Sequence, residues 1–294
     1  MAIARQFESE NFAVLTHENQ GAAATRNEAF RVCQGDYVQW LDADDLLSPN
    51  KIERQMEVAQ QRNSRTLLSS GWGYFMYRPA KAKFVPGPLW SDLTPLEWLL
   101  RKWENNAHMQ TATWLVSREL TEAAGPWDTR LLGDDDGEYF FRVIRGSSDI
   151  RFVPEAKVYY RITPSNRLSH IGRSDKKIEA QFLGMKLQID YLRSLEDNER
   201  VRAASRHYLK LWLPHFYPDR PDIVREAQDL CATLGGQLDI PKMGWKYRWI
   251  EQLFGPHTAK EVQVRYNRCK STVIRMWDQA LFAMEHRRTD GSEV

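Results

Sequence analysis

The sequence has few of the features that mark secreted, disulfide-bonded or membrane-spanning proteins. Its 294 residues include only three cysteines, Cys33, Cys231 and Cys269, which are scattered and form no Cys-x-x-Cys pair. A disulfide framework or a structural zinc site is therefore not expected, and a reducing cytosol fits this cysteine usage. No run approaches the ~18 apolar residues that cross a bilayer, and the first residues lack the apolar core of a signal peptide. We expect a cytoplasmic protein that is soluble or at most peripheral to a membrane.

A large net charge is also missing. The 41 basic and 39 acidic residues leave a formal charge of +2. The protein therefore has no long-range electrostatic field that would favour nucleic acid as a partner. The apolar fraction of 42% and the charged fraction of 27% are those of an ordinary soluble globular protein. The length exceeds a typical domain of ~100–150 residues, which predicts one large domain or two unequal ones.

The first half of the chain alternates strand and helix patterns. Residues 12–15 and 37–41 are short apolar or aromatic runs typical of strands, and an alanine-rich helix is expected over 22–33. Ser48 and Pro49 predict the start of the next helix, with Ser48 as its N-cap. Strand, helix, strand, helix in this order predicts a parallel α/β unit. Later strands are expected over 67–70, 72–77, 111–116 and 158–161, and helices over 96–103 and 137–145.

The second half is helical by its apolar spacing. Strand signals end near residue 173, and amphipathic helices follow. The fold class is therefore a mixed α/β domain over residues 1–172 with an all-helical extension over 173–294. The helices of the extension are expected over 176–195, 198–213, 222–234 and 259–284.

An acidic cluster directly follows the strand expected over 37–41. Asp42 and Asp44 stand one residue apart. Ligands of open α/β sheets bind at the carboxyl ends of strands, and two such carboxylates can approach one Mg²⁺ or Mn²⁺ that keeps positions open for phosphate oxygens. A solvated acidic turn is the alternative. A calcium-binding EF-hand loop is excluded because Leu46 and Leu47 occupy its ligand and glycine positions.

A second acidic cluster, Asp134, Asp135 and Asp136, begins the helix expected over 137–145. The helix macrodipole favours negative charge at this end, which is an adequate structural explanation. Adjacent carboxylates also repel one another, and this repulsion can raise the pKa of one of them toward the range of a general base. Both interpretations stay open from these residues alone.

Three motifs, taken in their order and spacing, are more specific than either cluster. They are Asn19-Gln20-Gly21 followed by Thr25-Arg26-Asn27, then Gly35-Asp36-Tyr37, and then the acidic run from Leu41 to Asp45. Together they resemble the middle of a family 2 glycosyltransferase of the GT-A fold, which has a Rossmann-like mixed sheet.

The resemblance implies roles for the residues around the first cluster. Asp44 would be the principal metal ligand, and Asp42 would hold the nucleotide or the metal shell. Gly21, Arg26 and Asn27 would lie beside the donor, with Arg26 at its diphosphate. A surface salt bridge is the alternative role of Arg26.

The resemblance extends to the second cluster and to about residue 172. Asp135 and Asp136 match the acidic motif at the acceptor side, with Asp136 at the position of the catalytic base. Because three Asp stand together, the alignment of this cluster with the family's acidic motif could be shifted by one residue. Residues 103–113, with His108 and Gln110, would line the acceptor pocket or fill a buried structural role. Many relatives carry His, in some of them a further metal ligand, where this chain has Thr163; His170 lies nearby as a candidate substitute or a surface residue.

The N-terminal part of the family's fold has no expected counterpart in this sequence. The fold normally opens with two βα units, so ~60 residues are expected to be absent at ~30 per unit. Such a truncation would expose apolar surface and leave strand edges unpaired. Either Met1 is an internal start of a longer protein, or the chain is a degenerate or fragmentary copy.

The resemblance implies a metal-dependent inverting glycosyltransferase in cell-surface polysaccharide or glycoconjugate synthesis. Its partners would be a nucleotide-diphosphate sugar and a saccharide or lipid-linked acceptor. A phosphohydrolase of the haloacid dehalogenase type is disfavoured, since it needs Thr or Val where Leu46 stands. A non-catalytic scaffold acting through the helical tail remains an alternative. Residues 245–250 and 260–275 mix basic and aromatic side chains, which suits peripheral contact with an anionic membrane or ordinary helix packing.

Overall fold

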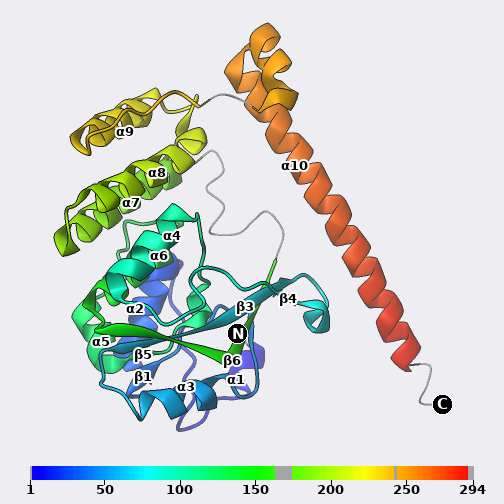
Figure 1. Ribbon diagram of the computed structural model, residues 1–294. Helices are drawn as coiled ribbons and strands as arrows, with labels where there is room; N and C mark the ends of the chain where they lie inside the picture. Colours follow the sequence, from blue (N-terminus) through cyan, green and yellow to red (C-terminus); the bar gives the residue numbers. More distant parts are fainter. Residues whose placement is uncertain (1, 163–173, 242–243, 291–294) are drawn as a thin grey trace.

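The computed structural model describes residues 2–162, 174–241 and 244–290 (Figure 1). Helix α1 (Ala2–Arg5) is followed by α2 (Ala22–Val32), which confirms the helix expected over 22–33. The strand expected over 12–15 is wrong, because within the described ranges the pairing there is limited to an isolated bridge between Ser9 and Phe12. A strand needs a neighbour for its backbone groups, and this segment has none among the described residues. Phe12 and Leu15 are exposed.

The described strands form two sheets. In the first sheet β1 (Tyr37–Val38) pairs antiparallel with β5 (Val116–Ser117). The other edge of β1 has no partner strand in the described ranges. The second sheet has the order β2-β6-β3-β4, with β2 (Leu46–Leu47), β6 (Asp149–Arg161), β3 (Thr66–Phe75) and β4 (Lys83–Phe84).

The parallel unit expected at the front of the chain is not formed. Strands β1 and β2 each pair antiparallel with a strand from much later in the chain, and the parallel pair of the structure is β3 with β6. Adjacent strand and helix patterns predict a crossover only when the two strands pair with each other, and here they do not. The run 111–116 is also divided, into the short helix η2 (Thr111–Thr113) and the start of β5.

Helices flank the larger sheet. Helix α3 (Lys51–Ala59) begins later than expected, with Asn50 at its N-cap. Ser48 does not cap it, because its Oγ accepts a hydrogen bond from the amide of Lys157 on β6. The remaining helices of this part are η1 (Pro79–Lys81), α4 (Pro95–Glu104), α5 (Arg118–Ala124) and α6 (Asp135–Gly146).

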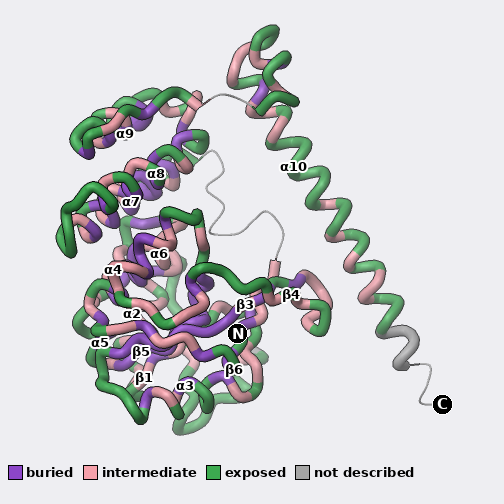
Figure 2. The backbone as a smooth tube through the Cα atoms, viewed as in Figure 1, coloured by how far each residue is buried: buried purple, intermediate pink, exposed green. Residues whose placement is uncertain are grey.

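The expected helical extension is present. Its helices are α7 (Asp175–Leu195), α8 (Glu199–Phe216), α9 (Pro221–Thr233) and α10 (Trp245–Asp290). Helix α10 begins earlier than expected and is broken at Gly255, whose φ is 83°. It is exposed along most of its length (Figure 2). The expected boundary at residues 172–173 lies outside the described residues. Across the described ranges, no helix has both the length and the apolar composition that a membrane span requires.

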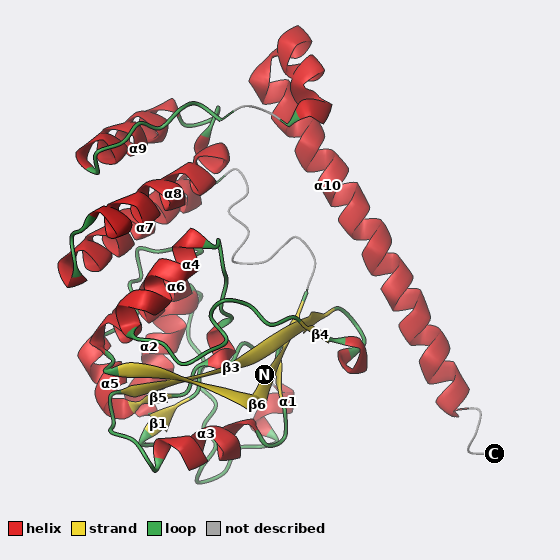
Figure 3. Cartoon of the chain, in the orientation of Figure 1, coloured by secondary structure: helices red, strands yellow, loops and turns green. Residues whose placement is uncertain are grey.

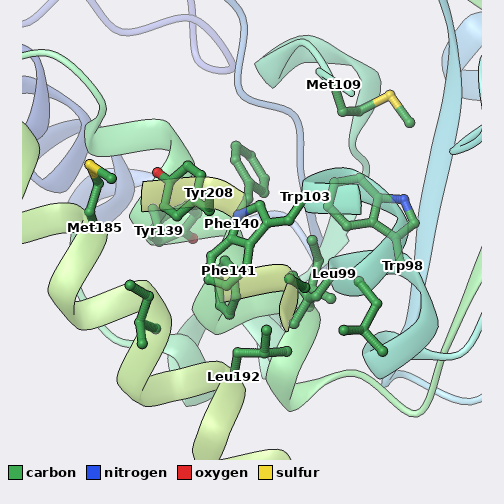
Figure 4. Packing of buried hydrophobic residues seen from close by; sticks show 14 of the residues in the cluster. Trp98, Leu99, Trp103, Met109, Tyr139, Phe140, Phe141, Met185, Leu192 and Tyr208 are labelled. Atoms are coloured by element: carbon green, nitrogen blue, oxygen red, sulfur yellow. The ribbon is translucent and has the colours of Figure 1, made fainter. Parts of the chain in front are cut away.

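One hydrophobic core joins the two parts of the chain. Figure 3 shows the strands between α3 on one side and the helices α4 and α6 on the other. Helices α7 and α8 pack onto α4 and α6 from outside, where Trp103 of α4 stacks on Tyr208 of α8 with ring centroids 4.5 Å apart (Figure 4). Phe141 of α6 and Met185 of α7 belong to the same buried cluster. The start of α6 is therefore supported by helices of the extension.

Candidate active site

The first acidic cluster is a turn anchored by Asp45. The amide of Asp45 donates to the carbonyl of Asp42 at 3.2 Å. Its buried carboxylate accepts hydrogen bonds from Gln110 Nε2 at 2.5 Å and from the amide of Arg161 at 2.8 Å. Burial raises the pKa of Asp45 to about 7; the Arg161 amide opposes this rise, and Asp44 and Asp42 add to it. Asp45 thus fixes the turn to β6 and to the loop before η2.

Asp42 and Asp44 point outward from this turn. Asp44 is exposed and Asp42 is half-exposed. The described residues contain no group of three or more His, Cys, Asp or Glu side chains that could hold a metal ion by themselves. One exposed and one half-exposed carboxylate nevertheless fit Mg²⁺ or Mn²⁺, since such ions are commonly held by one or two carboxylates together with phosphate oxygens and water. Thr163 and His170 lie outside the described residues.

Arg26 joins the two acidic clusters. Its Nη2 donates to Asp42 Oδ1 at 3.0 Å, and its Nη1 donates to Asp135 Oδ2 at 2.7 Å. The guanidinium also lies over the ring of Trp127, 4.5 Å from its centroid. Trp127 in turn stacks on Tyr139 of α6 at 3.9 Å. Arg26 thus forms salt bridges, the alternative role considered for it, but they are partly buried because its side chain is only 18% exposed; its role at a diphosphate stays a prediction.

Gly21 and Asn27 shape the helix that carries Arg26. Gly21 has a φ of 88°, a conformation that favours glycine, and its carbonyl accepts hydrogen bonds from the amide and hydroxyl of Thr25. Asn27 uses both polar atoms of its side chain on the backbone of Trp127: Nδ2 donates to the carbonyl at 2.9 Å, and Oδ1 accepts from the amide at 2.8 Å. Asn27 thereby holds Trp127 beneath Arg26.

The three carboxylates of the second cluster face different partners. Asp135 bonds Arg26, whereas Asp136 Oδ2 accepts from Thr111 Oγ1 at 2.9 Å and its Oδ1 accepts from the amide of Gly137 at 2.9 Å. Burial raises the pKa of Asp135 to about 6; Asp136 adds to this rise and Arg26 opposes it. Asp134 lies at the N-cap position of α6, where burial raises its pKa.

The side chain of Asp136 lines a small recess. Lys102, His108 and Met109 line the recess together with α6, and its volume is about 30 Å³, roughly the room of one water molecule. The ring of His108 is reached by solvent, but the surrounding protein desolvates it and lowers its pKa, against the opposing effect of Asp136. Gln110, expected either at the acceptor pocket or in a buried structural role, is buried against Asp45.

Several residues of the site carry no recognisable sequence signal. Thr111 falls within the segment expected at the acceptor side, but nothing in the sequence pairs it with Asp136. Trp127 stands in a turn motif that gives no hint of its contact with Arg26. Gln181 and Gln188 of α7 donate to Asp134 Oδ2 at 3.1 and 3.4 Å from about fifty residues away, and only the packing of α7 on α6 shows this contact.

The sequence has relatives among glycosyltransferases. Residues 2–122 match glycosyl transferase family 2, a span that includes Arg26, Asp42 and Asp44 but not the second cluster. An uncharacterized glycosyltransferase of Methanocaldococcus jannaschii is 24% identical over 173 residues, 56% of this chain and 54% of the relative. Uncharacterized glycosyltransferase EpsJ of Bacillus subtilis is 23% identical over 177 residues, 58% and 51% of the two chains. The chain thus spans about half the length of these curated relatives.

The fold also has a solved counterpart. The crystal structure of S. aureus TarS 1–349 in complex with UDP-GlcNAc superposes with a TM-score of 0.56 at 12% identity. It covers 77% of this chain and 64% of that chain. At this identity the likeness concerns the fold alone, and it confirms the GT-A-like α/β architecture expected from the sequence motifs.

Proposed function

We propose that this chain, whose residues 2–122 belong to glycosyl transferase family 2, transfers a sugar from a nucleotide-diphosphate donor to an acceptor hydroxyl with inversion at the anomeric carbon. The observation that carries the proposal is the bridge through Arg26, which holds the outward-facing Asp42 next to the acidic start of α6. A transferase needs its leaving-group site and its base side by side. The UDP-GlcNAc complex of TarS supports a nucleotide sugar as the donor class.

The donor side is formed by Asp42, Asp44 and Arg26. Asp44 and Asp42 would hold Mg²⁺ or Mn²⁺, which when bound supplies positive charge against the departing diphosphate. Arg26 adds a fixed positive charge at the same place, and its planar guanidinium suits phosphate oxygens. Trp127 and Asn27 keep that side chain in position.

The acceptor side is formed by Asp136. Its carboxylate is oriented by Thr111 and by the amide of Gly137, and it faces the recess lined by His108. Asp136 would take the proton of the acceptor hydroxyl as that oxygen attacks the anomeric carbon from the face opposite the diphosphate. Asp135 is held by Arg26 and would position the cluster. Of the three consecutive Asp, the proposal assigns Asp136 as the base because its carboxylate faces the recess.

The acceptor would be a saccharide or a lipid-linked saccharide, in cell-surface polysaccharide or glycoconjugate synthesis. One short match supports this setting: the putative teichuronic acid biosynthesis glycosyltransferase TuaG of Bacillus subtilis is 44% identical over 50 residues, 17% of this chain and 20% of the relative.

Asp136→Asn tests the assignment of the base. The variant keeps the shape of the side chain and its bond to Thr111 but cannot accept a proton. We expect release of nucleoside diphosphate from a panel of nucleotide sugars to fall by about 10²–10⁴-fold, the usual contribution of a general base, while donor binding is kept. Glu155→Gln, an exposed acid on β6, is the matched control. Full activity of Asp136→Asn would remove Asp136 from the mechanism.

A further inference from the structure

The polar contacts between helix α10 and the rest of the protein lie on one face of the helix. Asp278 accepts from Arg78 Nη2 at 2.7 Å, and Lys260 donates to Asp219 at 2.9 Å. Lys260 and Asp278 are 18 residues apart, about five helical turns, so they lie on the same face of the helix. Glu285, which also pairs with Arg78 at 2.8 Å, follows Asp278 by about two turns. This face of α10 is therefore the inner one.

The outer face of α10 carries an apolar stripe. Val262, Tyr266, Val273, Met276 and Trp277 follow one another at the spacing of a single helix face. Their exposed fractions lie between 38% and 69%. Asp278 comes five residues after Val273, which places it about 140° around the helix from the stripe. An amphipathic helix normally buries its apolar face, so an outward stripe of this length marks an interaction surface.

Positive charges border the stripe on both sides. Arg265 lies about 80° from Val273 in one direction around the helix, and Lys270 lies about 60° from it in the other. Both side chains are exposed, and neither forms an ion pair within the part of the chain that the structure describes. The acids Asp278 and Glu285 are turned inward to Arg78. A partner on the outer face would therefore meet apolar, aromatic and basic side chains together.

We infer that the outer face of α10 is a docking surface for an anionic membrane. Aromatic side chains such as Trp277 and Tyr266 suit the boundary between headgroups and acyl chains, and flanking Arg and Lys suit anionic headgroups. A second copy of the chain fits less well. In a parallel pair of α10 helices Arg265 of one copy would face Lys270 of the other, which places like charges together. The helix lies on the bilayer and does not cross it.

Flotation of the full chain with lipid vesicles tests this inference. One set of vesicles is pure phosphatidylcholine, and the other contains about 30% phosphatidylserine, which supplies the negative surface potential that attracts basic segments. We expect binding to the anionic vesicles that weakens about tenfold when salt is raised to shorten the screening length. The triple variant Val273→Ser, Met276→Ser, Trp277→Ser and the double variant Arg265→Gln, Lys270→Gln should each reduce binding about tenfold or more.

Matched control variants distinguish vesicle binding through the outer face of α10 from non-specific adsorption of the protein to vesicles. Val85→Ser removes an equally exposed apolar side chain elsewhere, and Arg62→Gln with Arg225→Gln removes two exposed charges elsewhere. These variants should bind vesicles as the parent does. Binding that is equal on neutral vesicles, or unchanged in the α10 variants, overturns the inference. Absence of vesicle binding combined with a dimer that the triple variant dissociates would assign the stripe to a second copy instead. The assay involves no glycosyl transfer, so its result is independent of the proposed activity.

Discussion

At the scale of single residues, Arg26 ties the two acidic clusters together. Asp42 and Asp135 come from segments more than ninety residues apart, and each places an oxygen on one guanidinium. A planar group with several donors can serve two carboxylates at once, which a Lys cannot do with the same geometry. Without Arg26 the largely buried Asp135 would lose its charged partner.

Arg26→Met should lower stability by about 1.5–3 kcal/mol, the range for hydrogen bonds to charged groups. Urea denaturation measures this loss. Arg31→Met is the matched control on the same helix, because Arg31 is 69% exposed and its ion pair among the described residues is with Glu28 one turn away. Its change should stay below about 0.5 kcal/mol. Equal losses in the two variants would show that the bridge adds nothing beyond a surface pair.

Lys51 is a second residue with a testable charge. It is fully buried, and its Nζ donates to the amide oxygens of Gln39 at 2.5 Å and Gln55 at 2.6 Å. Burial lowers the pKa of Lys51 to about 7. The unfolded chain therefore binds more protons than the folded chain between about pH 7 and the ordinary value of 10.5. By linkage, this makes stability rise with pH in that window.

Lys51→Met should remove that pH dependence. The parent is expected to gain up to about 1.4 kcal/mol per pH unit from Lys51 as pH rises from about 7, and the variant should gain less by that amount. Denaturation at several pH values between about 7 and 9 gives the difference. Parallel stability curves for parent and variant would contradict the lowered pKa.

At the scale of elements, α7 supports the acidic start of α6. Gln181 and Gln188 donate to Asp134, and the Tyr191 hydroxyl donates to Glu138 at 3.1 Å. These contacts come from the helical extension, so the first turn of α6, which also carries Asp136, is held partly by a helix outside the α/β part. The stacking of Trp103 on Tyr208 fixes the same arrangement through the core.

Gln181→Leu should destabilise the protein by about 1–3 kcal/mol, because a carboxylate in the protein interior loses a donor and leucine cannot replace it. Thermal unfolding and urea denaturation measure the change. Gln61→Leu, at an exposed position, serves as the control and should have little effect. If Gln181→Leu were as stable as its control, Asp134 would not depend on α7.

At the scale of the whole molecule, the helices could be predicted from sequence and much of the sheet could not. The helices over 22–33, 96–103 and 176–195 are encoded by local apolar spacing, and the structure confirms them. Strands depend on partners that lie far away in the chain. Residues 12–15 have strand-forming side chains but no neighbour among the described residues, whereas β6 extends over thirteen residues because β3 lies beside it.

The candidate site, like the fold, could be predicted from sequence only in part. Both acidic clusters could be singled out from the sequence, and the structure brings them together on Arg26, while their functional roles stay predictions. The partners of these clusters could not be predicted, since Thr111, Trp127 and Gln181 meet the site only through packing of distant segments. A buried role for Gln110 is one of the two sequence-based expectations, but its partner Asp45 could not be predicted, because that contact depends on Asp45 turning inward.

We propose above all that Asp44 and Asp42 hold a divalent cation for a nucleotide diphosphate. Calorimetric titration of the full chain with UDP, with and without Mn²⁺ or Mg²⁺, tests it most directly. We expect binding with the cation, about tenfold or more weaker without it, and a matching loss in Asp44→Asn but not in the exposed control Glu53→Gln. Absence of UDP binding with the cation, or binding that neither its removal nor Asp44→Asn changes, would contradict the claim.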